Sequence, residues 1–335
     1  MPDSPELSET KRALLEKYLR GEISVAGTTK SAAQNNGTSE VAPASTPIPT
    51  VPDTPTPLSV AENASLRVPV VPIRSSGSKR PLFYSHVHVD GGAFYCFTLA
   101  DRLGPDQPFY ILEPYRMEDG DIPPTLEAMA TAYIESMRTI QPHGPYLLSG
   151  FCGGGLIVFE MAHQLRKQGE EVDLLLLIEP VDGPGPATYR MLLRTAAGRF
   201  IRAISKPFRV PTQKQLNLFL RIRHFYLLPR YPAYRKTHKP WLKPTLEMLY
   251  QDWIGIFVWL ISAYKPQKYP GKVTYFWAKE EFLSRKEWRG KQVEAAEREM
   301  LMIAGNHWSC RTDYLQEYAG QLNQTVSEAQ AFESD

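Results

Sequence analysis

The sequence has few cysteines and no long hydrophobic run. Its 335 residues include only three cysteines, Cys96, Cys152 and Cys310. Their odd number and wide spacing argue against a disulfide framework and favour a reducing compartment. The longest apolar run, residues 253–261, is too short to cross a bilayer, and the N-terminus lacks a secretory pattern. We therefore expect a cytoplasmic protein with no membrane span.

Aromatic residues are absent from residues 22–78, which are instead rich in Pro, Ser, Thr and Ala. Such a segment buries too little surface to fold, so we predict a disordered linker over 22–78. Residues 1–21 precede it and have an apolar stripe that begins after Ser8 and ends at Gly21. This pattern predicts a short amphipathic helix, whose stripe packs either on the main domain or on another protein, as a docking helix would.

From residue 79 the pattern changes to short apolar runs alternating with amphipathic segments. Strands are expected at 82–87, 109–112, 146–150, 173–178, 272–278 and 300–304, and helices at 93–103, 126–140, 155–168 and 314–326. Continuous apolar strands between helices indicate an α/β fold with a mostly parallel central sheet and helices on both faces. We assign this domain to 79–327, with a helical lid inserted at about 184–262.

A strong excess of charge is also absent from the whole chain, whose formal net charge is +2, but one segment is basic. Residues 186–250 hold 14 lysines or arginines and a single acid, Glu247. This segment is either a lid with a solvated basic face or a docking surface for an anionic partner. We expect no nucleic-acid partner, because no recognition motif accompanies the charge.

A nucleophile elbow without its serine lies at Gly150-Phe151-Cys152-Gly153-Gly154. Its spacing is that of Gly-x-Ser-x-Gly, and it joins an expected strand to an expected helix. A thiol at a helix N-terminus lies in a field that favours the thiolate. Cys152 is therefore a working nucleophile, an inert relic, or a small apolar residue in a glycine-rich turn.

Two further side chains follow expected strands. Glu179 ends the strand at 173–178 and is our first choice for the acid that orients a histidine; Asp182, Glu280 and Glu281 are the alternatives. His307 follows the last strand. The chain order of nucleophile, acid and histidine is that of α/β-hydrolases, so we expect His307 to be the general base.

An oxyanion hole needs two backbone N–H groups. One is expected from Gly153, directly after Cys152, and the other from the loop after the first strand, at Val89 or Asp90. His86 and His88 in that loop fit half of a metal site, but no companion cluster of ligands is apparent and we expect no metal.

Nine short motifs resemble the thioesterase domains of nonribosomal peptide and polyketide synthetases, and they occur in family order over about residues 80–325. They are Pro81-Leu-Phe83, His88-Val-Asp-Gly-Gly92, Gly104-Pro-Asp-Gln-Pro108, Gln141-Pro-His-Gly-Pro-Tyr146, Gly150-x-Cys-x-Gly154, Glu160-Met-Ala-His-Gln-Leu165, Tyr264-x-Pro266, Tyr269-Pro-Gly271 and Gly305-Asn-His307.

The resemblance implies an α/β-hydrolase fold with a helical lid after the strand that carries the acid. It places the nucleophile on Cys152, the acid on Glu179 and the histidine on His307, with Cys for the usual Ser and Glu for the usual Asp. The implied function is a thioesterase that takes an acyl or peptidyl group from a carrier protein and releases it by hydrolysis, cyclisation or aminolysis. The alternatives are a transferase between carrier proteins and a non-catalytic carrier-binding scaffold.

The resemblance also implies a partner, an acyl or peptidyl carrier protein of a synthetase. The substrate is held on the carrier's 4'-phosphopantetheine arm, and the enzyme needs no cofactor of its own. Because carriers are acidic and the arm bears a phosphate, basic lid residues are the expected contacts. The candidates are Arg199, Arg202, Arg221 and Arg223.

Overall fold

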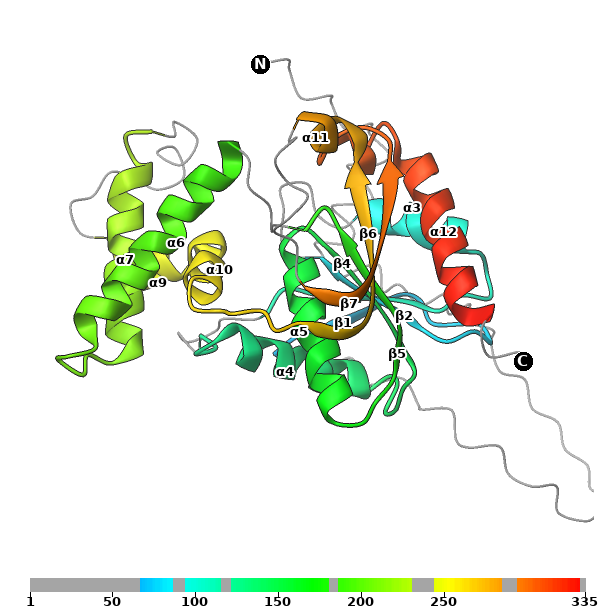
Figure 1. Ribbon diagram of the computed structural model, residues 1–335, viewed down its shortest axis with the longest axis horizontal. Helices are drawn as coiled ribbons and strands as arrows, with labels where there is room; N and C mark the ends of the chain where they lie inside the picture. The colour runs from blue at the N-terminus through cyan, green and yellow to red at the C-terminus, as the bar shows by residue number, and fades with distance from the viewer. Residues whose placement is uncertain are drawn as a thin grey trace, which may run out of the picture. The chain divides into compact units, whose positions relative to one another are not determined.

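The computed structural model describes residues 67–86, 94–115, 122–180, 186–230, 244–284 and 294–331. A seven-stranded sheet forms its centre, with the strand order β1-β3-β2-β4-β5-β6-β7 (Figure 1). Strand β1 pairs antiparallel with β3, and the other neighbours pair in parallel. The strands are β1 Val70–Arg74, β2 Leu82–His86, β3 Phe109–Leu112, β4 Tyr146–Phe151, β5 Val172–Ile178, β6 Tyr269–Ala278 and β7 Ala295–Ile303.

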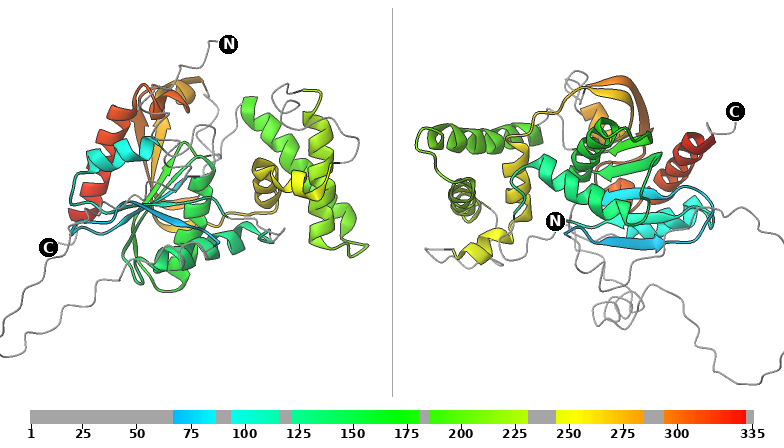
Figure 2. Two further views of the ribbon diagram at one scale, coloured as in Figure 1. Left: turned by 180° about the vertical axis from the view of Figure 1, so that it is seen from behind. Right: turned by 90° about the horizontal axis from the view of Figure 1, so that it is seen from below.

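Helices cover both faces of the sheet, as the apolar strands require. Helices α4 (Leu126–Arg138) and α5 (Gly153–Lys167) lie on one face, and α3 (Tyr95–Leu103) and α12 (Leu315–Ala331) lie on the other (Figures 1 and 2). Each face closes over its own apolar cluster. Every residue of β4 is buried, which fits its central place in the sheet. The predicted mostly parallel α/β fold is therefore confirmed.

The sheet extends further than the sequence predicted at its two edges. Strand β1 lies inside the stretch that we expected to be linker, and Val68 and Val70 are buried, so the predicted linker end at 78 is wrong. Strand β7 begins at Ala295 rather than 300, because residues 295–299 also pair with β6 although most of them are exposed. The helix predicted within 1–21 and the linker up to residue 66 lie outside the described residues.

The described residues between β5 and β6 form four helices, which we call the lid. They are α6 Pro186–Ser205, α7 Thr212–Leu227, α9 Leu246–Tyr250 and α10 Trp253–Ile261. Helix α10 is almost wholly apolar and packs against α6 and α7 (Figure 2). No helix in the described ranges is both long and apolar enough to span a membrane.

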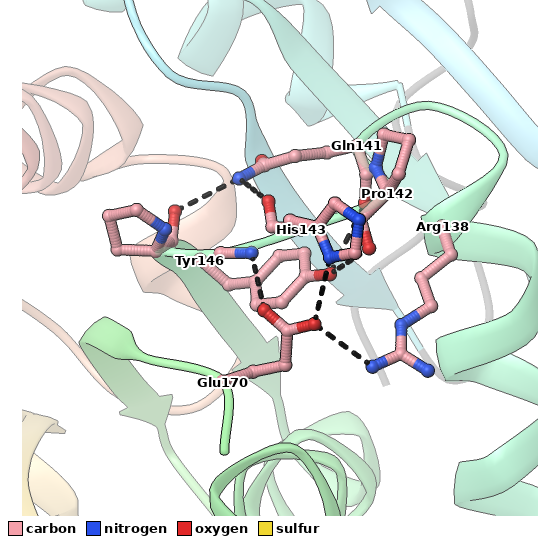
Figure 3. Close-up of polar contacts among 8 residues, drawn as sticks. Arg138, Gln141, Pro142, His143, Tyr146 and Glu170 are labelled. Carbon is pink, nitrogen blue, oxygen red and sulfur yellow. Dashed lines mark hydrogen bonds and ion pairs between the residues drawn. The ribbon is translucent and has the colours of Figure 1, made fainter. Parts of the chain in front are cut away.

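The loop that leads into β4 is held by the carboxylate of Glu170 (Figure 3). Its Oε2 accepts the N–H of Gly144 at 2.8 Å, and its Oε1 lies 3.2 Å from Nδ1 of His143 and 3.4 Å from Nη2 of Arg138. The phenol of Tyr146 donates to the carbonyl of Pro142 at 2.9 Å. These bonds fix the start of the strand whose other end carries Cys152.

Candidate active site

Cys152 lies at a sharp turn between β4 and α5. Its φ of 55° and ψ of −120° are in a region that side-chain-bearing residues rarely adopt. The turn leaves no room for neighbouring side chains: a Cβ on Gly150 would lie 2.4 Å from the carbonyl oxygen of Gly154, and one on Gly154 would lie 2.3 Å from that of Ser85. The paired glycines are thus required by close backbone approach, as a nucleophile elbow demands.

Gly153 is the first residue of α5, directly after Cys152. The first N–H groups of a helix lack partners within the helix, and together with the helix dipole they favour a negative charge beside the thiol. The N–H of Gly153, which we predicted as an oxyanion-hole amide, thus lies at the N-terminus of α5. Val89, Asp90 and His88 lie outside the described residues.

Glu179 follows β5 directly and is almost fully buried, with 4% of its surface exposed. Its Oε1 accepts the N–H of Ala278 at 2.6 Å, and its Oε2 accepts from Nδ1 of His307 at 3.3 Å. Its own N–H donates to the carbonyl of Phe276, although its φ is 45°. Two elements of the sheet, β5 and β6, thus hold this carboxylate against the histidine.

His307 lies in a turn that follows β7 and is shaped by Asn306. The side-chain oxygen of Asn306 accepts the N–H groups of Trp308 and Ser309, each at 3.0 Å, and its own N–H donates to Oγ of Ser309 at 2.8 Å. The ring of Phe151 packs 5.0 Å from the imidazole, centroid to centroid. The turn and the stacking fix the position of the imidazole ring.

The side chain of Cys152 also acts on this imidazole, so Cys152, His307 and Glu179 meet at one site. Burial opposes protonation of His307, but the hydrogen bonds and negative charges of Cys152 and Glu179 outweigh it and raise the pKa to about 9. The raised pKa makes the imidazole of His307 a strong acceptor for a proton, and Sγ of Cys152 is the candidate donor.

Among the alternative acids, the carboxylate of Glu280 bonds Asn306 rather than His307. Glu280 is exposed, and its Oε2 accepts from the side-chain amide of Asn306 at 2.9 Å. Glu281 lies in the short helix α11 (Lys279–Ser284), and Asp182 lies outside the described residues.

A buried polar layer lies behind the elbow on the α3 and α12 side. Three phenol groups and an imidazole form a chain, Tyr318 to Tyr84 to Tyr95 to Nδ1 of His86, with each step 3.0 Å long. Sequence reasoning missed this chain. The alternation of Tyr84 and His86 on one face of β2 was the signal that points to it.

Arg311 was also missed, because it follows the histidine motif in a segment without a recognisable pattern. It lies in the short helix η2 (Ser309–Arg311) and is 8% exposed. Its guanidinium carbon lies 4.5 Å from the ring centroid of Phe151, 5.1 Å from that of Trp308 and 5.6 Å from that of Tyr95.

The four candidate arginines of the lid differ in their surroundings. Arg199 and Arg221 are exposed, and Nε of Arg199 donates to the carbonyl of Ser262. Arg202 stacks on Trp259 at 3.5 Å and donates to its carbonyl, while Arg223 forms a buried ion pair with Asp252 at 2.6 Å. Arg202 and Arg223 therefore hold the lid helices together, and only Arg199 and Arg221 present their charge to solvent.

Comparison with known proteins finds a family model, "Thioesterase domain", that matches residues 80–216. The chain is 44% identical over 112 residues to a dimodular nonribosomal peptide synthase of Bacillus subtilis (strain 168), a match that covers 33% of this chain and 5% of the relative. It is 42% identical over 125 residues to malpinin synthetase of Mortierella alpina, covering 37% and 2%.

Solved structures with a similar fold include the NocB thioesterase domain from the nocardicin cluster. The sequence identity is 23% and the TM-score is 0.49, with 77% of this chain and 98% of that chain covered. A four-domain nonribosomal peptide synthetase aligns with 22% identity and a TM-score of 0.49, covering 77% and 20%. The chain spans only 5% of the length of the Bacillus subtilis synthase and 2% of that of malpinin synthetase.

Proposed function

We propose, from the thioesterase domain that residues 80–216 carry, that this chain takes an acyl or peptidyl group from a carrier-protein phosphopantetheine thioester onto Cys152. The group is then released by hydrolysis, cyclisation or aminolysis. The observation that carries the proposal is the meeting of Cys152, His307 and Glu179 at the glycine elbow. The relatives named as synthetases support the carrier as partner.

In the first half-reaction, His307 removes the proton from Sγ of Cys152, and the thiolate attacks the thioester carbonyl. Glu179 holds Nδ1, so Nε2 is the nitrogen that faces the thiol. The oxyanion that forms is stabilised by the N–H of Gly153 and by a second amide, for which Val89 and Asp90 are our candidates. As the intermediate collapses, the carbon–sulfur bond to the carrier breaks, and His307 returns the proton to the departing phosphopantetheine thiol.

The thiol nucleophile changes the energetics of the second half-reaction. An acyl group on serine is an oxoester, which is lower in energy than the thioester it came from. An acyl group on Cys152 is still a thioester, so loading is readily reversible and the acyl carbon stays activated for an amine or a thiol. Attack by such an acceptor forms its bond to the acyl carbon as the bond to Sγ breaks, and His307 passes the acceptor's proton to Sγ.

A transfer function is a second candidate, and the identity of Cys152 is the observation that favours it. Since the acyl-enzyme and the carrier thioester are close in energy, a second carrier thiol is a competent acceptor. The positive charges of Arg199 and Arg221 at the lid surface fit an acidic carrier in both readings.

Intact-protein mass spectrometry of wild type and C152A, each incubated with acyl-loaded carrier, tests the proposal. We expect the mass of the acyl group to appear on the wild type and not on C152A. Absence of the adduct from both proteins would contradict both enzymatic functions and favour a non-catalytic carrier-binding role. Addition of an empty holo-carrier distinguishes the two enzymatic functions. A transferase loads this carrier, whereas a releasing enzyme yields free acid, ring or amide.

A further inference from the structure

Arg311 is a buried cation that the proposed chemistry does not use. The side chain is more than nine-tenths buried, and its Nε has no hydrogen-bond partner among the residues that the structure describes. A buried guanidinium is costly unless something compensates for its lost hydration. Here the compensation comes from aromatic faces, because the rings of Phe151, Trp308 and Tyr95 surround the group.

Two of these rings belong to the immediate neighbours of the reacting residues. Phe151 directly precedes Cys152 at the end of β4, and Trp308 directly follows His307 after β7. One planar guanidinium therefore lies against a side chain from each of the two segments that carry the proposed nucleophile and base. Phe151 also packs on the imidazole itself, with 5.0 Å between centroids.

We infer that Arg311 is a positioning residue, which clamps Phe151 and Trp308 and thereby sets how Cys152 and His307 meet. We call Arg311, Phe151 and Trp308 the arginine clamp. The inference rests on the proposed function, since it concerns the same nucleophile and base. A planar guanidinium fits between two rings in a way that a flexible ammonium does not.

The pH dependence of Cys152 alkylation by iodoacetamide reports on the contact between Cys152 and His307, and it requires no acyl substrate. His307 stabilises the thiolate only while it stays in hydrogen-bonding reach, so a loosened clamp moves the midpoint of reactivity to higher pH. The other titratable groups described near Cys152 and His307 are not expected to titrate between pH 5 and pH 9 in a way that mimics this shift. Glu179 is the acid that bonds His307. Burial raises the pKa of Cys310 to about 12 and that of Tyr95 well above its usual value. His86 lies behind Tyr95.

The test compares wild type with R311M and R311K by the rate of alkylation between pH 5 and pH 9, located by peptide mapping. Methionine is long, apolar and favourable beside aromatic rings, so R311M is suited to fold. We expect the midpoint to rise by about one pH unit, with about a tenfold slower reaction at a pH below the midpoint. R311K keeps the positive charge but lacks the planar guanidinium, so we expect its midpoint to shift as that of R311M does.

R102M is the matched control, because Arg102 is an exposed arginine of α3 that bonds Gln316 of α12 and touches neither ring of the clamp. Its midpoint should equal that of wild type. If R311M does not fold, W308L removes the histidine side of the clamp at a position that is 54% exposed, with a smaller shift in the same direction.

An unchanged midpoint in a folded R311M or W308L, or complete rescue by R311K, would overturn the clamp. These outcomes differ from a failure of the proposed function. If the wild-type thiol itself titrates like an ordinary cysteine and takes up no acyl group, then the proposed nucleophile is at fault and not Arg311.

Discussion

The carboxylate of Glu179 accepts from His307 on one oxygen and from the backbone of Ala278 on the other, at 3.3 Å and 2.6 Å. The second bond ties the acid to the end of β6, so the carboxylate is fixed by the sheet and not by the histidine alone. The φ of Glu179 is 45°, so the residue that holds His307 lies in a backbone region that side-chain-bearing residues rarely adopt.

Replacing Glu179 should disable the histidine without unfolding the site. In E179Q the amide fills the same space but no longer favours the imidazole tautomer and charge that the reaction needs. We expect the rate of Cys152 acylation to fall by roughly 10³- to 10⁴-fold, by analogy with the effect of such a change in a serine triad. E280Q is the control, since the carboxylate of Glu280 bonds the side-chain amide of Asn306 and not His307. A larger loss in E280Q than in E179Q would make Glu280 the acid.

The raised pKa of His307 makes folding stability depend on pH. Its value rises from 6.5 to about 9 on folding, so the folded state binds the proton more tightly than the unfolded state. The resulting stability is fully present below about pH 6.5 and is lost as the pH rises through about 9. Urea unfolding of wild type and H307N across this window should show the wild-type advantage shrink by up to about 3 kcal/mol. A constant difference between the two proteins would contradict the raised pKa.

The core strands and the meeting of Cys152, Glu179 and His307 could be predicted from sequence because their signals are local. Continuous apolar runs define β2, β4 and β5, and each of the three residues directly follows a strand or turn motif. Strand β1 was missed because it is an edge strand with only five residues, and its pairing with β3 is encoded in the distant segment 109–112. Composition alone favoured a linker there.

The charge of the lid was predictable, but the use of each arginine was not. Arg199, Arg202, Arg221 and Arg223 look alike in sequence, and only tertiary packing distinguishes them. Arg223 forms an ion pair with Asp252, and Arg202 stacks on Trp259. Both contacts join parts of the lid that are far apart in the chain. The position of Arg311 between Phe151 and Trp308 likewise depends on how the ends of β4 and β7 meet.

A methyl group at the elbow should displace Cys152. In G154A the new Cβ would lie 2.3 Å from the carbonyl oxygen of Ser85, so β2 or the elbow must shift. We expect acylation to fall by at least about 100-fold, the loss that a misplacement of about 1 Å produces. In the control G320A the new Cβ meets nothing within 4 Å on helix α12, and we expect a gain of about 0.5–1 kcal/mol in unfolding free energy. Acylation rates and urea unfolding together check both variants, and full activity of G154A would refute the tight turn.

Two neighbouring arginines of α7 should fail in different ways. R221A removes an exposed charge, so we expect weaker turnover of carrier-bound substrate, unchanged turnover of a small-molecule thioester, and a smaller salt dependence. R223A leaves Asp252 buried without its partner, and breaking such a pair costs about 3–5 kcal/mol. Kinetics at two salt concentrations and thermal unfolding separate the two effects. Equal loss on both substrates in R221A would contradict carrier docking at this surface.

The N-terminal segment should be removable only up to the start of the sheet. Deletion of residues 1–66 leaves β1 in place, so we expect the thermal stability and small-thioester turnover to match the full chain, while choice among carrier partners is impaired if the predicted helix docks.

Deletion of residues 1–75 also removes Val68 and Val70, which are 0% and 2% exposed, and uncovers the edge of β3. Loss of two buried valines costs roughly 3 kcal/mol or more. Because β3 and β2 lie between β1 and β4 in the sheet, we expect the elbow after β4 to survive this deletion. The longer deletion should therefore lower the unfolding temperature. In its folded fraction, the pH midpoint of Cys152 alkylation should equal that of wild type. Equal stability of the two deletion variants would show that β1 does not stabilise the sheet.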